Sequence, residues 1–174
     1  MTSNQKTTIY IGKIYPTPIG SIWVAVSEKG LIAVNIGGDE GDFRNNLGPA
    51  GDHQIIFDPE KTTTAIQQIS EYLFGKRRFF DLPIDWDILN PFQQLALQAT
   101  YSIPYGQVRT YSEIARQIGK PYAARAVGRA EATNPMPLVI PCHRVIGKDG
   151  KLHGYGAPRG IETKAWLLHL EGAM

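Results

Sequence analysis

The sequence contains a single cysteine, Cys142, among its 174 residues. One thiol cannot form an internal disulfide, and it cannot supply the several ligands of a cysteine-rich zinc site. The chain also lacks an apolar run long enough to span a bilayer, and residues 1–8 lack the apolar core of a secretory signal. These absences predict an intracellular protein, cytoplasmic or, in a eukaryote, nuclear. They also predict no membrane partner, and we expect neither a bound metal nor a cofactor.

Net charge is low, at +2, but the charged residues are divided unevenly. Residues 1–86 carry 8 Lys+Arg and 10 Asp+Glu, whereas residues 87–174 carry 10 and 6. A basic second half fits a nucleic-acid surface and a merely solvated face about equally well. A hydrophobic content of 43% with 20% charged residues is typical of a globular protein, and this length allows one domain or two small ones.

The first half has the pattern of a small α/β domain. Segments rich in β-branched and aromatic residues predict three strands, with short connections that favour antiparallel neighbours: 8–15, 21–26 and 31–36. A mobile loop rich in glycine and acidic residues should follow over 37–51, with His53 as an exposed loop residue. Helical spacing of apolar residues predicts a helix over 59–74, and 79–84 is expected to be extended. We find no catalytic constellation here, and we expect a domain boundary after residue 86.

The second half predicts mainly helices. Asn90 before Pro91 is a typical helix start, a capping side chain followed by proline at the first position. Helix-start and helix-stop residues predict four helices: one from Pro91 to before Ile103, one from Thr110 or Ser112 to Gly119, one over 121–129, and one over 161–170. The tight connection at Gly119 indicates a helix-turn-helix, and a hairpin over 145–155 would make it a winged module. The small residues of its second helix suit either close approach to a partner or helix-on-helix packing.

The only thiol lies in the run Ile140-Pro141-Cys142-His143-Arg144-Val145. Thiolate is the nucleophile, and a neighbouring cation lowers a thiol pKa, so His143 and Arg144 are candidate activators. Neighbouring side chains of a straight strand point to opposite faces, so His143 can assist Cys142 only if the chain turns or a water bridges them. We expect a buried strand ending at Ile140 and then a turn that carries the thiol. A lone cysteine is more often a small buried hydrophobic residue, so a catalytic role needs further context.

That context is the whole run 134–146, Asn-Pro-Met-Pro-Leu-Val-Ile-Pro-Cys-His-Arg-Val-Ile. It resembles the active-site signature of the O6-alkylguanine-DNA alkyltransferases, also called methylated-DNA–protein-cysteine methyltransferases. The likeness runs from about residue 90 to residue 172 and includes further segments: 103–106, 111–112, 124–128, 154–155, 164–168 and Glu171. The first half resembles the family only in the order of its strands and helix. The resemblance implies an α+β fold, with a ribonuclease H-like N-terminal α/β domain on an antiparallel sheet and a mainly helical, winged helix-turn-helix C-terminal domain.

The resemblance also implies a reaction and a partner. In this family the thiolate attacks the alkyl carbon on O6 of guanine, or on O4 of thymine, after the base has been flipped out from the minor groove. The alkyl group stays on sulfur, so each molecule acts once. The implied partner is double-stranded DNA containing O6-alkylguanine, bound by a monomer that can cluster on DNA.

Several residues take roles through this resemblance. Cys142 would be the acceptor, and His143 would be the base, acting through a water. Glu171 would orient and charge-balance His143, whereas the residue pattern alone favours an exposed carboxylate at a helix end. Asn134 would be the hinge between the recognition helix and the active-site turn. Tyr111 would donate a proton or hydrogen bond to the leaving guanine and crowd the 3′ phosphate.

The resemblance assigns DNA and pocket contacts as well. Arg125 would fill the stack in place of the extruded base. The pocket would be lined by three residues: Val145, Tyr155 and Gly156. Contacts with the DNA backbone or groove are expected from five more: Gln93, Ser112, Lys120, Ala124 and Lys148. The loop 156–160 is longer than the pocket loop that the resemblance to the human relative implies, and Pro158 would stiffen it. The cysteines that bind zinc in some relatives are absent.

Three alternatives remain at this point. A non-catalytic alkyltransferase-like protein shares the DNA module but lacks the acceptor cysteine. A winged-helix regulator would select a DNA sequence and would not need the Cys-His pair. A cysteine hydrolase would turn over repeatedly and would use a histidine distant in sequence, such as His153 or His169.

Overall fold

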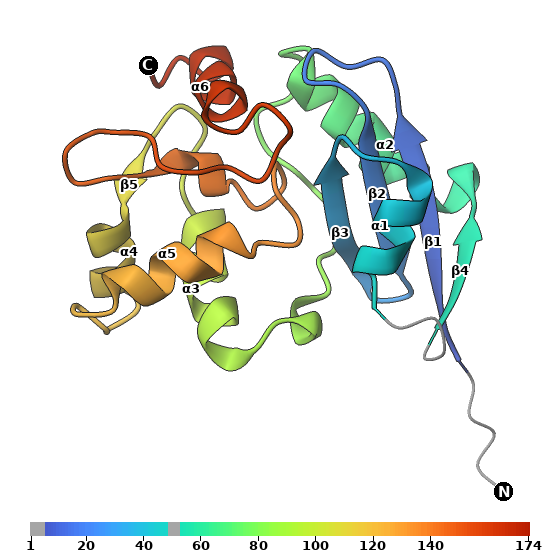
Figure 1. Ribbon diagram of the computed structural model, residues 1–174, viewed down its shortest axis with the longest axis horizontal. Coiled ribbons are helices and arrows are strands. Elements are labelled where there is room, and N and C mark those ends of the chain that lie inside the picture. The colour runs from blue at the N-terminus through green and yellow to red at the C-terminus, as the bar shows by residue number, and fades with distance from the viewer. Residues whose placement is uncertain (1–5, 49–52) are drawn as a thin grey trace, which may run out of the picture. The chain divides into compact units, whose positions relative to one another are not determined.

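The computed structural model describes residues 6–48 and 53–174, and its chain divides between Asp85 and Trp86 into two compact units (Figure 1). The boundary expected after residue 86 lies one residue from this division. None of the described helices has the length and apolar character needed to cross a membrane.

The first unit is built on a four-stranded sheet. Its strands are β1 (Thr7–Ile14), β2 (Ile22–Ser27), β3 (Gly30–Ile36) and β4 (His53–Phe57), in the order β3-β2-β1-β4. The predicted antiparallel pairing holds for β1 with β2 and for β2 with β3. The fourth strand, which the sequence analysis missed, pairs parallel with β1, so the sheet is mixed. His53 therefore begins a strand and is partly buried, contrary to the expected exposed loop.

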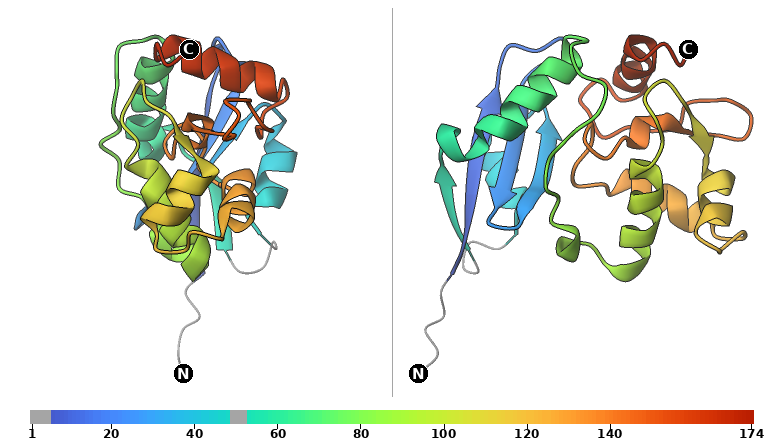
Figure 2. Two further views of the ribbon diagram at one scale, coloured as in Figure 1. Left: turned by 90° about the vertical axis from the view of Figure 1, so that its left-hand side faces the viewer. Right: turned by 180° about the vertical axis from the view of Figure 1, so that it is seen from behind.

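Two helices cover opposite faces of this sheet (Figure 2). Helix α2 (Pro59–Leu73) confirms the predicted helix, and its N-cap Asp58 accepts hydrogen bonds from two backbone amides. It lies so close to β1 that a Cβ on Gly12 would approach Thr62 Oγ1 to 2.2 Å, and only glycine fits there. Helix α1 (Glu40–Asn46) packs Phe43 against the other face. That helix replaces part of the expected loop over 37–51, and residues 49–51 of the loop lie outside the described residues.

The second unit is mainly helical. Its elements are the short 3-10 helix η1 (Trp86–Ile88) and the helices α3 (Pro91–Tyr101), α4 (Tyr111–Gln117), α5 (Ala124–Ala132) and α6 (Ile161–Leu170). The predicted caps are present: Asn90 Oδ1 accepts from Gln93 N, and Thr110 forms a capping box with Glu113. Helices α3, α4 and α5 enclose one apolar core that includes Ala96, Ile114 and Val127.

The helix-turn-helix is formed by α4 and α5, joined through Gly119 in the left-handed region at φ 73°. The second helix begins at Ala124, three residues later than predicted, because residues 120–123 form a turn closed by Ala123 N donating to Lys120 O. Figure 2 shows α6 lying over the segment that carries Cys142.

Two expected β features of this unit are not formed among its described residues. No strand precedes Cys142: residues 135–140 make successive turns, because the prolines at 135 and 137 cannot donate to a ladder. No hairpin forms over 145–155. A tight turn does close there, with Gly147 N donating to Lys151 O at 3.0 Å. Strand β6 (Val145–Ile146), however, pairs parallel with β5 (Arg109–Thr110), and residues 152–160 run as an irregular, glycine-rich loop.

Candidate active site

Cys142 begins a short 3-10 helix, η2 (Cys142–Arg144), so the thiol does lie on a turn, as predicted. Two hydrogen bonds of the Asn134 side chain fix the backbone that precedes Cys142. Asn134 Nδ2 donates to Ile140 O at 2.9 Å, and Asn134 Oδ1 accepts from Met136 N at 3.0 Å. Leu138, between these contacts, adopts a left-handed φ of 74°, which is uncommon for a residue other than glycine. Asn134 thus ties the end of α5 to the turn that carries the thiol.

Behind the turn, His143 and Arg144 both contact the carboxylate of Glu171, and all three side chains are buried. His143 Nε2 lies 2.8 Å from Glu171 Oε1. Arg144 donates through Nε to Oε2 at 2.9 Å and through Nη2 to Oε1 at 2.9 Å, the two-pronged geometry that suits guanidinium and carboxylate. Glu171 is therefore not the exposed helix-end carboxylate that the residue pattern alone favours.

The segment 103–106 completes this cluster from the other side. Gly106 N donates to Glu171 Oε2 at 3.1 Å, and Ile103 O accepts from Arg144 Nη1 at 2.5 Å. Tyr105 Oη donates to Leu170 O at 3.0 Å and so fixes the end of α6. Gly106 has a φ of 77°, and a Cβ there would press on Glu171 O. The Ile-Pro-Tyr-Gly motif thus positions the carboxylate.

These contacts decide the charge of each group. Burial alone would raise the pKa of Glu171, but the hydrogen bonds from His143 and Arg144 outweigh it and hold that pKa well below its ordinary value. Burial lowers the pKa of His143, against the opposing effect of Glu171, so the imidazole is neutral at neutral pH. A carboxylate only accepts hydrogen bonds, so the imidazole proton is on Nε2 and Nδ1 keeps its lone pair.

Cys142 opens onto a cavity of about 710 Å³ in the second unit. The cavity wall combines residues of α4, α5, η2, the loop 147–156 and α6: Tyr111, Ser112, Ala124, Arg125, Gly128, Glu131, Ala132, Cys142, Gly147, Lys148, His153, Gly154, Tyr155, Gly156 and Lys164. Burial, followed by the charge of Glu131, raises the pKa of the Cys142 thiol to about 12. Burial likewise raises the pKa of the Tyr111 hydroxyl, which stays protonated.

The raised thiol pKa corrects the expectation that His143 and Arg144 lower it. Neither side chain brings an uncompensated positive charge to the sulfur, because the imidazole is neutral and the guanidinium is paired with Glu171. The resting side chain is a thiol, and its proton must leave as the sulfur attacks.

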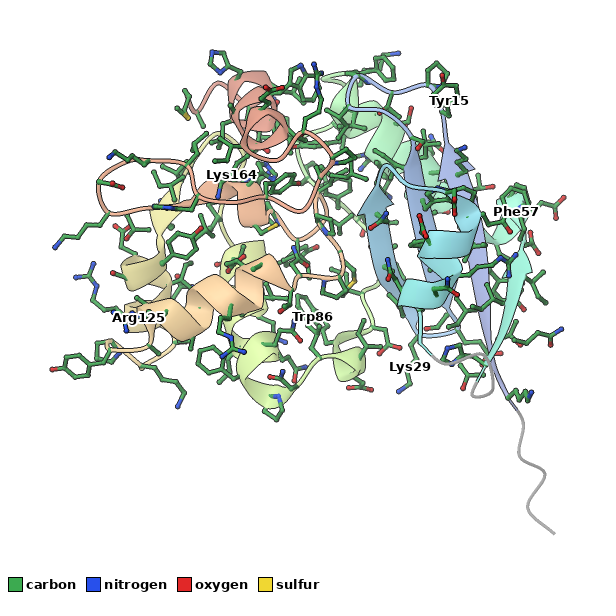
Figure 3. The ribbon with its side chains drawn as sticks, viewed as in Figure 1. Tyr15, Lys29, Phe57, Trp86, Arg125 and Lys164 are labelled. Carbon is green, nitrogen blue, oxygen red and sulfur yellow. The ribbon has the colours of Figure 1, made fainter. Side chains whose placement is uncertain are left out.

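Most of the residues expected to contact DNA or substrate lie around this cavity. Arg125 is exposed at the start of α5, and Figure 3 shows it at the periphery, whereas Lys164 points into the interior. Three expected residues do not line it. Val145 packs in the apolar core, Gln93 donates to Thr133 at the end of α5, and Lys120 is exposed in the turn before α5.

Two ionisable residues of the cavity wall were not among the predicted site residues. Lys164 is 1% exposed, and its Nζ donates to Val145 O at 2.7 Å. Glu131 is 7% exposed. The helical period was the available signal, because Lys164 and Glu171 share one face of α6 with Leu167 and Leu168, and Glu131 shares the buried face of α5 with Val127.

Each of the two units matches a family of known proteins. Residues 10–86 match the family described as 6-O-methylguanine DNA methyltransferase, ribonuclease-like domain, and residues 91–173 match the DNA binding domain of the same protein family. A methylated-DNA–protein-cysteine methyltransferase of Methanosarcina barkeri is 43% identical over 158 residues, which are 91% of this chain and 94% of that protein. The corresponding protein of Methanosarcina acetivorans is 38% identical and covers 92% of this chain and 97% of its own length.

Solved structures of related proteins have the same fold as this chain. The O6-methylguanine methyltransferase of Mycobacterium tuberculosis superposes with a TM-score of 0.78 at 37% identity, covering 95% of this chain and 93% of that one. The OGT of the same bacterium in complex with DNA gives a TM-score of 0.77 at 37% identity over the same shares. The chain belongs to the methylated-DNA–protein-cysteine methyltransferase family, and it is a DNA-repair methyltransferase with a DNA-binding domain.

Proposed function

We propose that this protein removes the alkyl group from O6 of guanine, and from O4 of thymine, in double-stranded DNA by transferring it to Sγ of Cys142, once per molecule. The observation that carries the proposal is the position of the only thiol: it opens onto a cavity of about 710 Å³ and is backed by the buried His143–Glu171 pair. In the transfer step, Sγ of Cys142 forms a bond to the first carbon of the alkyl group as the bond between that carbon and O6 of guanine breaks. The product is a thioether and a restored guanine.

The proton movements balance through neighbouring groups. The thiol proton passes by way of a water to Nδ1 of His143, whose other nitrogen is already bonded to the Glu171 carboxylate. The imidazolium that forms is stabilised by that carboxylate. Tyr111 is protonated in the resting protein and lies in the cavity wall, where it can pass its proton to the guanine as the electrons return to the ring. The proton held on His143 then returns through water to the tyrosine oxygen, so that overall one proton moves from the thiol to the base. Regenerating the thiol would require another nucleophile to attack the alkyl carbon and expel the Cys142 thiolate, which is a poor leaving group from an alkyl carbon, so the sulfur is not regenerated.

The cavity is reached by extruding the base from the duplex. A base stacked in DNA cannot present O6 to a thiol that is 8% exposed. Arg125, exposed at the cavity wall and at the start of the second helix of the helix-turn-helix, would occupy the vacated place in the stack. Ser112, Ala124 and Lys148 lie at the same wall and would contact the DNA there. DNA as partner is also what the complex of the M. tuberculosis relative suggests.

The decisive test measures methyl groups transferred per molecule of protein. With methylated duplex DNA in excess, transfer should plateau at one equivalent, and mass spectrometry should place a single methyl group on the Cys142 peptide. The Cys142→Ser variant should bind DNA and transfer nothing, because the hydroxyl is a far weaker nucleophile. Continued transfer beyond one equivalent would instead indicate a turning-over hydrolase, and sequence-selective binding without transfer would indicate a regulator.

Base extrusion has its own test. Arg125→Ala should slow repair in duplex DNA much more than reaction with the free modified base, because only the duplex has a stack to open. Arg129→Ala is the matched control: it is an exposed arginine on the same helix that does not line the cavity. Equal losses on both substrates would assign Arg125 to the pocket or to folding rather than to the stack.

A further inference from the structure

Glu131 is a buried acid in the wall of the same cavity, and the alkyl-transfer step proposed above does not use it. It lies on the inward face of α5 with Val127 and Ala130, and it is 7% exposed. Four elements surround it with polar or titratable groups: Thr100 from α3, Tyr111 from α4, Cys142 from η2 and Lys164 from α6. A carboxyl in such a place normally has both oxygens satisfied.

Only one of its two oxygens is satisfied. Glu131 Oε1 lies 2.5 Å from Thr100 Oγ1, which is also 3.1 Å from Ala96 O. The threonine hydroxyl has one proton, so if it donates to Ala96 O, the carboxyl must donate to it. Glu131 Oε2 is fully buried and has no hydrogen-bond partner among the described residues. With Oε1 turned to Thr100, Oε2 is the oxygen left for a molecule in the cavity.

The charge state of this carboxyl follows from its few donors. Burial raises the pKa of Glu131 to about 8, although the hydrogen bond with Thr100 and the charge of Lys164 act in the opposite direction. At neutral pH the group is therefore mostly an uncharged acid. An uncharged acid can both donate and accept a hydrogen bond, whereas the ionised form only accepts and places a negative charge in the cavity that contains the sulfur.

We propose that Glu131 is a substrate-contacting residue: its buried, unpartnered Oε2 forms a hydrogen bond with the heteroaromatic base that enters the cavity beside Cys142. The inference rests on the proposed function, since it requires a base in this cavity. Such a base presents ring nitrogens and exocyclic groups along its edge, and a buried polar atom without a partner favours the complex that supplies one. In the bound state the acid is uncharged, so it orients the base without opposing the negative charge that develops on sulfur.

The test compares Glu131→Gln with Glu131→Met in single-turnover methyl transfer from duplex DNA. Glutamine keeps a neutral hydrogen-bonding group of the same shape at every pH, so its rate should match wild type at neutral pH. As the pH rises through about 8, wild type should lose the neutral acid, and the ratio of the glutamine rate to the wild-type rate should increase. Methionine has a similar length and no such group, and it should slow transfer roughly tenfold at neutral pH.

Two controls separate this contact from a structural role. Glu162→Gln, an exposed acid on α6, should give a rate ratio that does not change with pH. Thermal unfolding of each variant identifies any loss of rate that comes from loss of fold. The inference would be overturned if the ratio of the Glu131→Gln rate to the wild-type rate did not change with pH, or if Glu131→Met transferred methyl groups at the wild-type rate. Transfer of one methyl group to wild-type Cys142 would still support the proposed function in either case. A wild-type protein that accepts no methyl group would overturn both.

Discussion

The two units bury different kinds of side chain. The interior of the first unit is apolar, as in the cluster of Ile9, Ile11, Trp23 and Phe43, and Asp85 is the only charged residue buried among its described residues. The second unit buries six titratable side chains: Glu131, Cys142, His143, Arg144, Lys164 and Glu171. Buried charge is costly unless it is paired and hydrogen-bonded. The first interior therefore contributes packing, whereas the second also holds the groups that can perform chemistry.

The second interior itself contains two acids with opposite behaviour. Glu171 receives hydrogen bonds from His143, Arg144 and the Gly106 amide, and its pKa is well below the ordinary value. Glu131 has a single hydroxyl partner, and its pKa rises to about 8. Burial acts on both in the same direction, so the number of donors decides which acid is charged. One site thereby holds a fixed carboxylate behind the histidine and an uncharged acid facing the cavity.

Glu171→Gln should have the largest effect on stability, because it leaves the buried Arg144 without its counter-charge. We expect a loss of about 3–5 kcal/mol in the free energy of unfolding, measured by urea denaturation. Methyl transfer by the molecules that remain folded should also slow, since His143 loses the group that stabilises its charged form. The matched control is Glu162→Gln, an exposed acid on the same helix, which should change stability by less than about 0.5 kcal/mol.

The pH dependence of stability gives an independent check on the same pair. The pKa of Glu171 is depressed in the folded state, so its contribution is present above the pKa of the unfolded chain and is lost as the pH falls through the folded-state value. Wild type should thus lose stability below about pH 4.5, near the ordinary pKa of glutamate. The Glu171→Gln protein should lose less over that range, and an equal loss in both proteins would contradict the ion-pair account.

Local signals in the sequence predicted the elements that depend on local chemistry. The capping residues Asn90 and Thr110 each begin the helix expected of them, and Gly119 ends one. Apolar spacing likewise located α2 and α6 to within a residue or two. These features were predictable because a cap or a stop acts through its own neighbours in the chain.

Features set by distant partners were not predictable in the same way. The residues of β4 include Ile55, Ile56 and Phe57, which favour a strand, but nothing near His53 indicates that this strand pairs with the parallel edge of β1. The expected strand before Cys142 was wrong because the hydrogen bonds of Asn134 and the flanking prolines fold that segment into turns. The burial of Glu171 depends on residues 65 and 27–28 positions away, Gly106, Arg144 and His143, so its charge could not be read from its place at a helix end.

A smaller loss of stability is expected from a substitution in the apolar interior of the first unit. Its size can be compared directly with the loss expected from Glu171→Gln in the second unit. Ile69 is fully buried on the inward face of α2. Ile69→Ala should lower the free energy of unfolding by roughly 3 kcal/mol through lost burial and the cavity left behind, whereas Ile69→Val should cost only about 0.5–1.5 kcal/mol. Neither change touches the buried charges of the second unit. Methyl transfer per folded molecule should accordingly equal that of wild type, measured as the plateau on Cys142 and its rate in native conditions. A loss of rate per folded molecule as large as that of Glu171→Gln would show that the first interior also supports the chemistry, and the division of roles drawn between the two units would then be wrong.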